Sequence, residues 1–494
     1  MKKTLFCIIL FSSVYLSAQT VIVEEKFEKK NEPVGYRYLS NSKKFVIFKG
    51  EALPLVTVSY ETIFYMTKSA YIFDENGGKS TLFENEKLAN CTFSLTENSF
   101  KAYGGDKISV KSDRKYYLNN VYNGSILNDD IKNINSNYFG VINSNSEFIF
   151  NERNYSNSLF YSSFNDFYDL GFTNQKGKDK INFEKDEVYL EVFDIKSNHK
   201  NRIKLETTKL DLLKGKTLFE STEGVTFACQ MKGNDSFDLV TKSLSIKQNE
   251  STIYKTTYDI QGKKIKDLPL KLNLKDNFFI LSSCGAGYVN YFDWDVQAVN
   301  NYYEDSNNGD IYVYGIYTNK KSKIHKGFDP VGFYIFKFDK DGNKIWESIN
   351  PISDKYFEDL RCGISFHLNL FEYNGKLLFT NSVNELTEFS NYAIVDKYSG
   401  NLLKMSKVNY NNNTSFARNR AFISNTYNKE GFKNKAFSPI SFVAIDLSPA
   451  MNSYLKTIPS KGNSVYFETL FSDQGIWLVE TDNKEYYKVL LFKD

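Results

Sequence analysis

The sequence predicts an all-β protein, a single β-propeller of seven or eight four-stranded antiparallel blades. Aromatic residues make up 16% of the chain, with 35 Tyr and 42 Phe but only 8 Pro, and this composition suits pleated, half-buried strands. A chain of 494 residues exceeds the usual size of one domain, so it holds either several domains or one large repetitive one. A recurring strand–turn–strand pattern favours the repetitive domain.

The first residues have the pattern of a secretory signal. Lys2 and Lys3 precede an apolar run over residues 5–16, which is followed by Ser17, Ala18 and Gln19. We expect a signal peptide over residues 1–19 and a propeller over residues 20–494. The apolar run is too short to cross a bilayer. The expectation is therefore a secreted, periplasmic or cell-envelope protein without a membrane span, and a monomer.

The clearest repeat unit spans residues 309–347. Alternating strands are expected at 311–317 and 333–338, followed by a turn at Asp341 and Gly342 and a short strand that ends at Trp346. The Asp-Gly pair supplies the positive φ angles that a tight hairpin needs. The unit is therefore predicted to be a β-meander.

Degenerate copies of this unit recur, each with a strand, a near-terminal Asp, turn residues and a second strand. They begin at Tyr71, Val188, Ile253, Tyr392 and Phe442, with a further copy expected near 115–123. A period of roughly 50–80 residues with strand content predicts a radial array of sheets. The expected blades lie at 36–84, 91–130, 137–208, 209–270, 277–352, 358–408, 415–458 and 465–494.

The last expected blade has only three strands of its own. An open fourth edge invites aggregation, and propellers usually close the ring with a strand from the other terminus. Residues 21–28, directly after the signal peptide, are the predicted closing strand.

The stretch GFYIFKFDKDGNKIWE from Gly332 to Glu347 resembles the repeat of bacterial secreted β-propeller families, including the quinoprotein-like repeats. In these repeats a strand ending in Asp is followed by a turn and a docking tryptophan. Other copies lack the tryptophan, and Leu82, Leu205 and Leu268 or their neighbours are expected to fill its place. The resemblance implies the propeller fold, and we expect no cofactor.

Charge and motifs exclude several function classes. A net charge of +3 argues against a polyanionic partner such as nucleic acid. Metalloprotease, nucleophile-elbow and paired-cysteine motifs are absent from the sequence. Asp339, Asp341 and Asn343 are spaced as in calcium loops but lack the terminal Glu of such a loop. No catalytic residue and no metal site are therefore predicted.

The segment 288–303 is rich in aromatic and acidic residues. Flat rings beside carboxylates can stack on and hydrogen-bond a sugar or peptide. The predicted ligand-binding residues are Tyr288, Tyr291, Asp293, Trp294, Asp295, Tyr302 and Tyr303. The alternative is that these rings pack the segment on its own blade, and the tyrosine-rich segment 154–172 has the same two interpretations.

Two of the cysteines stand in strands expected at the inner edges of adjacent blades. Because export leads to an oxidising compartment, Cys229 and Cys284 are a possible disulfide. Packing of small side chains near the axis and a reactive thiol are the alternatives.

Three functions remain open from the sequence. The first is an exported noncatalytic binding or scaffold protein that recognises a glycan, peptide or envelope protein through rim loops. The second is a propeller glycoside hydrolase or lyase with carboxylates from different blades, for which Asp293, Asp295 and Glu304 are the first candidates. The third is a structural partner in envelope assembly.

Overall fold

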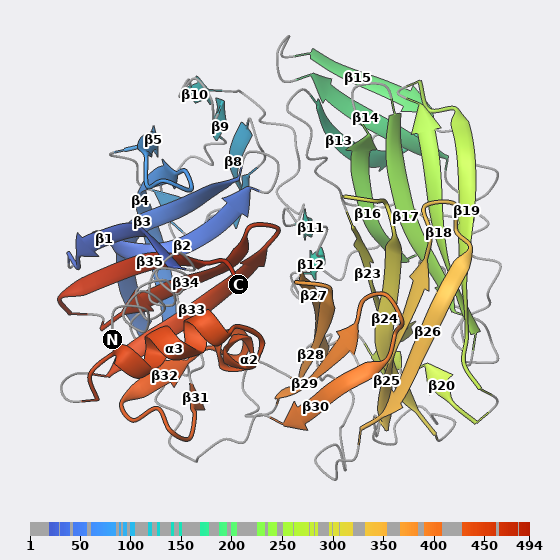
Figure 1. The fold of residues 1–494 in the computed structure, drawn as a ribbon. Helices are drawn as coiled ribbons and strands as arrows, with labels where there is room; N and C mark the ends of the chain where they lie inside the picture. The colour runs from blue at the N-terminus through green and yellow to red at the C-terminus, as the bar shows by residue number, and fades with distance from the viewer. Residues whose placement is uncertain are drawn as a thin grey trace, which may run out of the picture.

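A computed structural model describes, with short gaps, residues 19–84, 225–284, 296–319, 331–352, 366–407 and 427–494, together with shorter strands between 88 and 204. The chain is mostly β-strand, and nearly all of its strands pair antiparallel in successive sheets (Figure 1). None of the helices in the described residues is both long and apolar enough to cross a bilayer.

The first half of the chain forms five sheets. One contains β2 (Glu32–Leu39), β3 (Lys44–Val56), β4 (Glu61–Phe73), β5 (Lys79–Phe83) and β6 (Leu88–Ala89). The next contains β7 (Thr92–Leu95), β8 (Ser99–Tyr103), β9 (Tyr117–Asn120) and β10 (Ile126–Asn128). Three smaller or similar sheets follow: β11 (Gly140–Ile142) with β12 (Phe148–Phe150); β13 (Tyr168–Asn174), β14 (Val188–Asp194) and β15 (His199–Lys204); and β16 (Val225–Lys232), β17 (Ser236–Leu244), β18 (Glu250–Asp259) and β19 (Lys264–Asn273).

The second half adds four more. One contains β20 (Phe279–Ile280), β23 (Asn300–Glu304), β24 (Ile311–Thr318), β25 (Gly332–Phe338) and β26 (Lys344–Pro351), beside the pair β21 (Ser282–Cys284) and β22 (Val296–Ala298). The next contains β27 (Phe366–Tyr373), β28 (Lys376–Val383), β29 (Ser390–Asp396) and β30 (Leu402–Lys407). The last contains β31 (Tyr427–Asn428), β32 (Lys435–Phe437), β33 (Val465–Ser472), β34 (Gly475–Thr481), β35 (Tyr486–Phe492) and β1 (Gln19–Lys26).

Five of these sheets pack face to face in succession. Separate apolar clusters join the β16–β19 sheet to the β24 sheet, the β24 sheet to the β27–β30 sheet, that sheet to the β33–β35 sheet, and the β33–β35 sheet to the β2–β5 sheet. Strands in the middle of the stack are buried on both faces, as in β24 and β25, where every residue is buried. The arrangement is propeller-like, and it brings the last sheet of the chain against the first.

The two ends of the chain meet in one sheet. β1 pairs antiparallel with β35, with Gln19 opposite Phe492 and Lys26 opposite Tyr486 (Figure 1). The N-terminal strand therefore completes the sheet of the last three strands, where the sequence predicted that residues 21–28 would lie.

The predicted hairpins are present at Asp74, Asp194, Asp259, Asp339 and Asp396. At Asp339 the backbone N–H of Gly342 donates to the Asp339 carbonyl at 3.0 Å, and Asp339 Oδ1 accepts from the N–H of Asp341 and of Asn343 at 2.9 and 2.8 Å. Turn carboxylates of this kind bond their own backbone. Hydrogen bonding within the turn therefore accounts for the repeated aspartates.

The turn glycines receive side chains from the preceding sheet in the stack. Gly342 and Gly400 have φ of 84° and 74°, which favours glycine. A Cβ on Gly400 would lie 2.7 Å from Trp346 Cε3, and one on Gly342 would lie 2.8 Å from Leu268 Cδ2. Trp346 therefore docks on the following sheet as the repeat resemblance implied, and Leu268 fills the equivalent place in its own sheet. At Gly77 the contact is with backbone instead, because a Cβ there would lie 2.8 Å from the carbonyl oxygen of Ile22 in β1.

The sequence predicted a strand–turn–strand copy beginning at Phe442, and this prediction is wrong. Two helices occupy this region, α2 (Pro439–Leu447) and α3 (Pro449–Thr457). Ser438 and Ser448 cap the helix N-termini with their side chains, and a proline follows each cap. Serine at the cap and proline at the first helical position favour a helix start over a turn, and this Ser-Pro signal outweighs Asp446, the near-terminal aspartate of the predicted copy.

Two of the ranges expected to form a four-stranded blade do not form one such sheet. Range 137–208 holds both the β11–β12 pair and the β13–β15 sheet. In range 415–458, the described strands β31 and β32 join the last sheet, where β32 pairs in parallel with β33.

Candidate functional site

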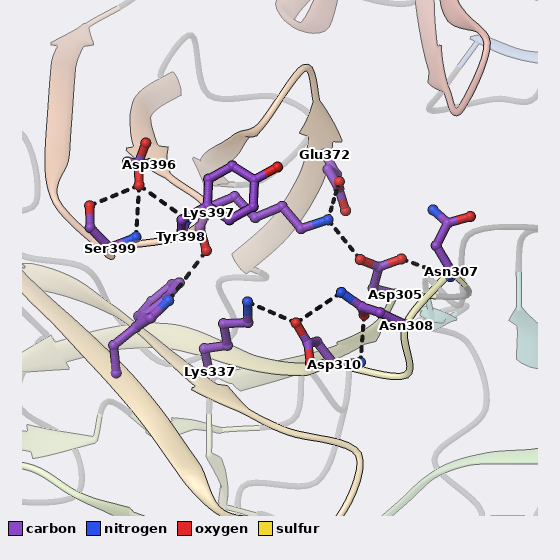
Figure 2. Close-up of polar contacts among 11 residues, drawn as sticks. Asp305, Asn307, Asn308, Asp310, Lys337, Glu372, Asp396, Lys397, Tyr398 and Ser399 are labelled. Carbon is purple, nitrogen blue, oxygen red and sulfur yellow. Dashed lines mark hydrogen bonds and ion pairs between the residues drawn. The ribbon is translucent and has the colours of Figure 1, made fainter.

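A group of five charged residues, three of them buried and two half-buried, lies between the β24 sheet and the β27–β30 sheet (Figure 2). Each residue stands at or near a turn, so turn geometry rather than any local motif positions it. The residues are Asp305 after β23, Asp310 before β24, Lys337 in β25, Glu372 in β27 and Lys397 after β29. We call this group the H-cluster.

Lys397 is the centre of the H-cluster. Its Nζ lies 2.7 Å from Asp305 Oδ2 across the junction of the two sheets, and it also bonds Glu372 Oε1 of its own sheet. The whole residue is 7% exposed and Asp305 is 1% exposed. One buried ammonium therefore bridges the buried carboxylate of Asp305 and the half-buried carboxylate of Glu372.

The turn between β23 and β24 orients Asp305. Its backbone N–H donates to the Asp310 carbonyl at 2.9 Å, and the Gly309 N–H donates to the Asp305 carbonyl at 2.8 Å. Asp305 Oδ1 accepts from the Asn307 N–H at 2.9 Å, which leaves Oδ2 for Lys397. Asp310 in turn holds the Lys337 ammonium at 2.8 Å.

The backbone of Lys397 is fixed as firmly as its side chain. Its N–H donates to the Gly375 carbonyl at 3.0 Å, and its carbonyl accepts from Trp346 Nε1 at 3.3 Å (Figure 2). Trp346 of the β24 sheet thus bonds the backbone of Lys397. The ammonium of Lys397 in turn bonds Asp305, which also belongs to the β24 sheet.

Burial and charge shift the acid–base behaviour of the H-cluster. Burial raises the pKa of Glu372, and the neighbouring Asp305 adds to this while Lys397 opposes it. Burial works against the charged form of Lys397, but hydrogen bonds to Asp305 and Glu372 raise its pKa overall. Burial, with the carboxylates of Glu372, Asp310 and Asp305, raises the pKa of the Tyr312 phenol well above its ordinary value.

The other three junctions in the stack also hold clusters in which lysine pairs with a carboxylate, and in these a tyrosine takes part as well. Each contains a carboxylate shared by lysine and tyrosine and contributed by neighbouring elements. The members are Asp238, Lys255, Tyr302 and Glu304 at the first junction; Tyr392, Lys404, Lys429 and Asp446 at the third; and Glu25, Lys49, Lys79 and Tyr487 at the fourth. We call all four groups junction clusters.

Glu25 shows how tightly a junction cluster binds its carboxylate. Its side chain lies 2.5 Å from Lys49 Nζ and 3.1 Å from Lys79 Nζ, and it accepts from the Tyr487 hydroxyl. Burial opposes its ionisation, but the bonds from Lys49 and Tyr487 lower its pKa to about 2. The N-terminal strand is thereby attached to the β2–β5 sheet.

The structure describes two of the seven predicted ligand-binding residues. Tyr302 and Tyr303 are neighbours in β23, so they face opposite sides of the sheet. Tyr302 is 2% exposed in one apolar cluster and donates to Glu304 at 2.8 Å, whereas half-buried Tyr303 packs against the next cluster, with its ring 5.7 Å from that of Tyr312. These two rings belong to the core. Tyr288, Tyr291, Asp293, Trp294 and Asp295 lie outside the described residues.

The cysteine pairing also stays a prediction. Cys229 lies in β16 and Cys284 in β21, on strands of different sheets, and their side chains are outside the described part of the chain.

Sequence reasoning missed the H-cluster because its members are far apart in the chain. Lys397 is 92 residues from Asp305 and 25 from Glu372. The available signal was position: Lys397 follows the turn residue Asp396, and Asp305 begins another acidic turn. Neither signal identifies a partner.

No family model and no curated protein sequence matches the chain. Solved structures that it resembles include dipeptidyl peptidase 4 of Porphyromonas gingivalis, at 11% identity and a TM-score of 0.34, over 91% of this chain and 57% of that one. The chain thus spans little more than half of that protein's length. Others are the polysaccharide lyase Uly1, at 9% identity, a TM-score of 0.35 and coverage of 94% and 90%, and quinohemoprotein alcohol dehydrogenase of Comamonas testosteroni, at 7% identity, a TM-score of 0.34 and coverage of 97% and 77%. Likenesses at this level assign neither a family nor an activity.

Proposed function

We propose that the chain is an exported, noncatalytic binding or scaffold protein, built as one closed ring of seven or eight blades. The N-terminal strand β1 would close this ring by completing the last sheet, which its pairing with β35 supports. The ligand would be a glycan, a peptide or an envelope protein.

The composition of the junction clusters carries this proposal. In the H-cluster, Lys397 and Lys337 occupy the carboxylates of Asp305, Glu372 and Asp310. A general acid or base must be within reach of a substrate proton, whereas Asp305 and Lys397 are almost fully buried. The same use of lysine and carboxylate at four successive junctions favours a role in joining sheets over a role in chemistry.

The ligand surface is proposed at the aromatic segment 288–299, with Tyr291 and Trp294 as stacking side chains. A glycan is the first ligand to test, because rings beside carboxylates suit sugars. The purified mature protein would be screened on a glycan array and by calorimetry, with Trp294→Ala as the test variant and Trp346→Phe as a control that retains an aromatic ring at a docking position. Binding lost in Trp294→Ala alone supports the proposal; retained binding, or a catalytic turnover of the glycan, contradicts it.

A glycoside hydrolase or lyase is the second candidate, and the H-cluster is the observation that favours it. Asp305 and Glu372 share one ammonium, so their carboxyl groups are adjacent, and the pKa of Glu372 is raised by burial. A pair of neighbouring carboxyl groups, one of them with a raised pKa, is what glycoside hydrolysis uses. The purified protein would be tested for polysaccharide hydrolysis, with Glu372→Gln as the test variant and Glu347→Gln as the control, because Glu347 is an exposed partner of Lys344. Hydrolysis that is lost only in Glu372→Gln would replace the first proposal with this one.

A further inference from the structure

The first residue of β1, Gln19, belongs to the sheet that joins the two ends of the chain. It lies opposite Phe492 of β35, and both Gln19 and Thr20 are half-buried. Ile22 and Val23 follow at 6% and 5% exposure, in the apolar cluster that joins the last sheet to the β2–β5 sheet. Gln19 is therefore a paired residue of the fold.

The sequence places the end of the proposed secretory signal beside Gln19. Cleavage of such a signal follows a small side chain, and Ala18 is the last alanine, serine or glycine before the β-branched run that starts at Thr20. A cut after Gln19, the boundary expected from the sequence, would follow a bulky side chain and would remove a residue that pairs with Phe492. The pairing therefore favours a cut between Ala18 and Gln19, which leaves Gln19 as the N-terminal residue of the exported chain.

An N-terminal glutamine has the groups for an intramolecular reaction. The ordinary pKa of an α-amine is about 7.7–8.0, so part of the population is uncharged near neutral pH. The amine nitrogen attacks the side-chain carbonyl carbon Cδ, the Cδ–Nε2 bond breaks, and Nε2 leaves as ammonia with a proton from the amine. The product is the lactam pyroglutamate, and its formation needs no oxidant, metal or second substrate.

The lactam would protect the strand on which the last sheet depends. β1 is the outermost strand of that sheet, and chain ends and exposed edges are where proteolysis concentrates. Aminopeptidases remove residues one at a time from a free α-amine, which a lactam lacks. Trimming from Gln19 would shorten the pairing with β35 and proceed toward Glu25, which bonds Lys49 and Lys79 of the β2–β5 sheet.

We propose that Gln19 is the N-terminal residue of the exported chain and a modification site, at which the terminal glutamine cyclises to pyroglutamate and blocks the free end of β1. The inference rests on the proposed export, and it is independent of the ligand. It places the end of the signal peptide at Ala18 in place of Gln19.

The test is mass spectrometry of the full chain expressed in a bacterial host, purified from the exported fraction and incubated at neutral pH, because the uncatalysed cyclisation is slow. The N-terminal peptide is expected to begin at Gln19 and to be lighter by one ammonia than the same peptide with a free amine. Gln19→Asn is the matched control, because asparagine keeps the amide but is one methylene too short to close this lactam. A broad-specificity aminopeptidase should shorten Gln19→Asn and leave the wild type intact.

Three outcomes would overturn the proposal: an exported chain that begins at another residue, an exported chain whose Gln19 keeps a free amine, or equal trimming of the wild type and Gln19→Asn. A chain that stays in the cytoplasm with residues 1–18 attached would overturn export as well. The two failures are therefore distinguishable.

Discussion

Replacing Lys397 with methionine tests whether the H-cluster holds two sheets together. The change keeps the length of the side chain but removes the ammonium that bonds Asp305 and Glu372. Asp305 is 1% exposed, so its carboxylate would be left buried with no counter-ion. Removing one partner of a buried ion pair costs about 3–5 kcal/mol, and we expect the free energy of unfolding at neutral pH to fall by that amount.

Urea unfolding followed by tryptophan fluorescence and circular dichroism measures this loss. Lys344→Met is the control, because the Lys344–Glu347 pair is 47% and 39% exposed, and an exposed pair contributes no more than about 1 kcal/mol. The loss in Lys397→Met should shrink toward pH 4, where the abandoned carboxyls can bind protons. A loss below about 1 kcal/mol at neutral pH, or one equal to that of the control, would refute the claim that Lys397 holds the two sheets together.

Two further predictions concern the junctions. Gly400→Ala should destabilise the protein by about 1–3 kcal/mol more than Gly431→Ala, because both have positive φ but only the Gly400 position would press on Trp346; equal losses by urea unfolding would contradict the docking. Glu25→Gln should cost about 1–2 kcal/mol, discounted for partial exposure. Because the pKa of Glu25 falls from 4.5 unfolded to about 2 folded, its contribution is complete above pH 4.5 and is lost as the pH falls toward 2. The gap between variant and wild type should therefore close over that interval, and a gap independent of pH would show that the ion pairs of Glu25 are not its cause.

The repeated hairpins could be predicted because their signals are local. Asp339 and Gly342 define a turn on their own, since one accepts from the turn backbone and the other supplies positive φ. The pairing of β1 with β35 could be predicted from the missing fourth strand. The two helices were not predicted because Asp446 fits the strand–turn pattern of the repeat, although Ser438-Pro439 and Ser448-Pro449 are local signals of helix starts.

The charged junctions could not be predicted in the same way. Lys49 bonds Glu25 across 24 residues and Lys255 bonds Glu304 across 49, and only the stacking of sheets brings them together. A buried and a solvated lysine look alike in sequence. The burial of Tyr302 could not be predicted for a related reason, because an aromatic residue in a strand can face a neighbouring sheet as well as solvent.

Thermal unfolding of the chain without residues 20–30, compared with the chain that retains them, tests the central claim most directly. In the structure, these residues supply β1, which pairs with β35 and places Glu25 in the last junction cluster. We predict a melting temperature lower by at least about 5 °C, with partial recovery when a peptide of sequence QTVIVEEK is added to fill the open edge. An unchanged melting temperature would contradict the claim that the two ends of the chain join to complete the last sheet.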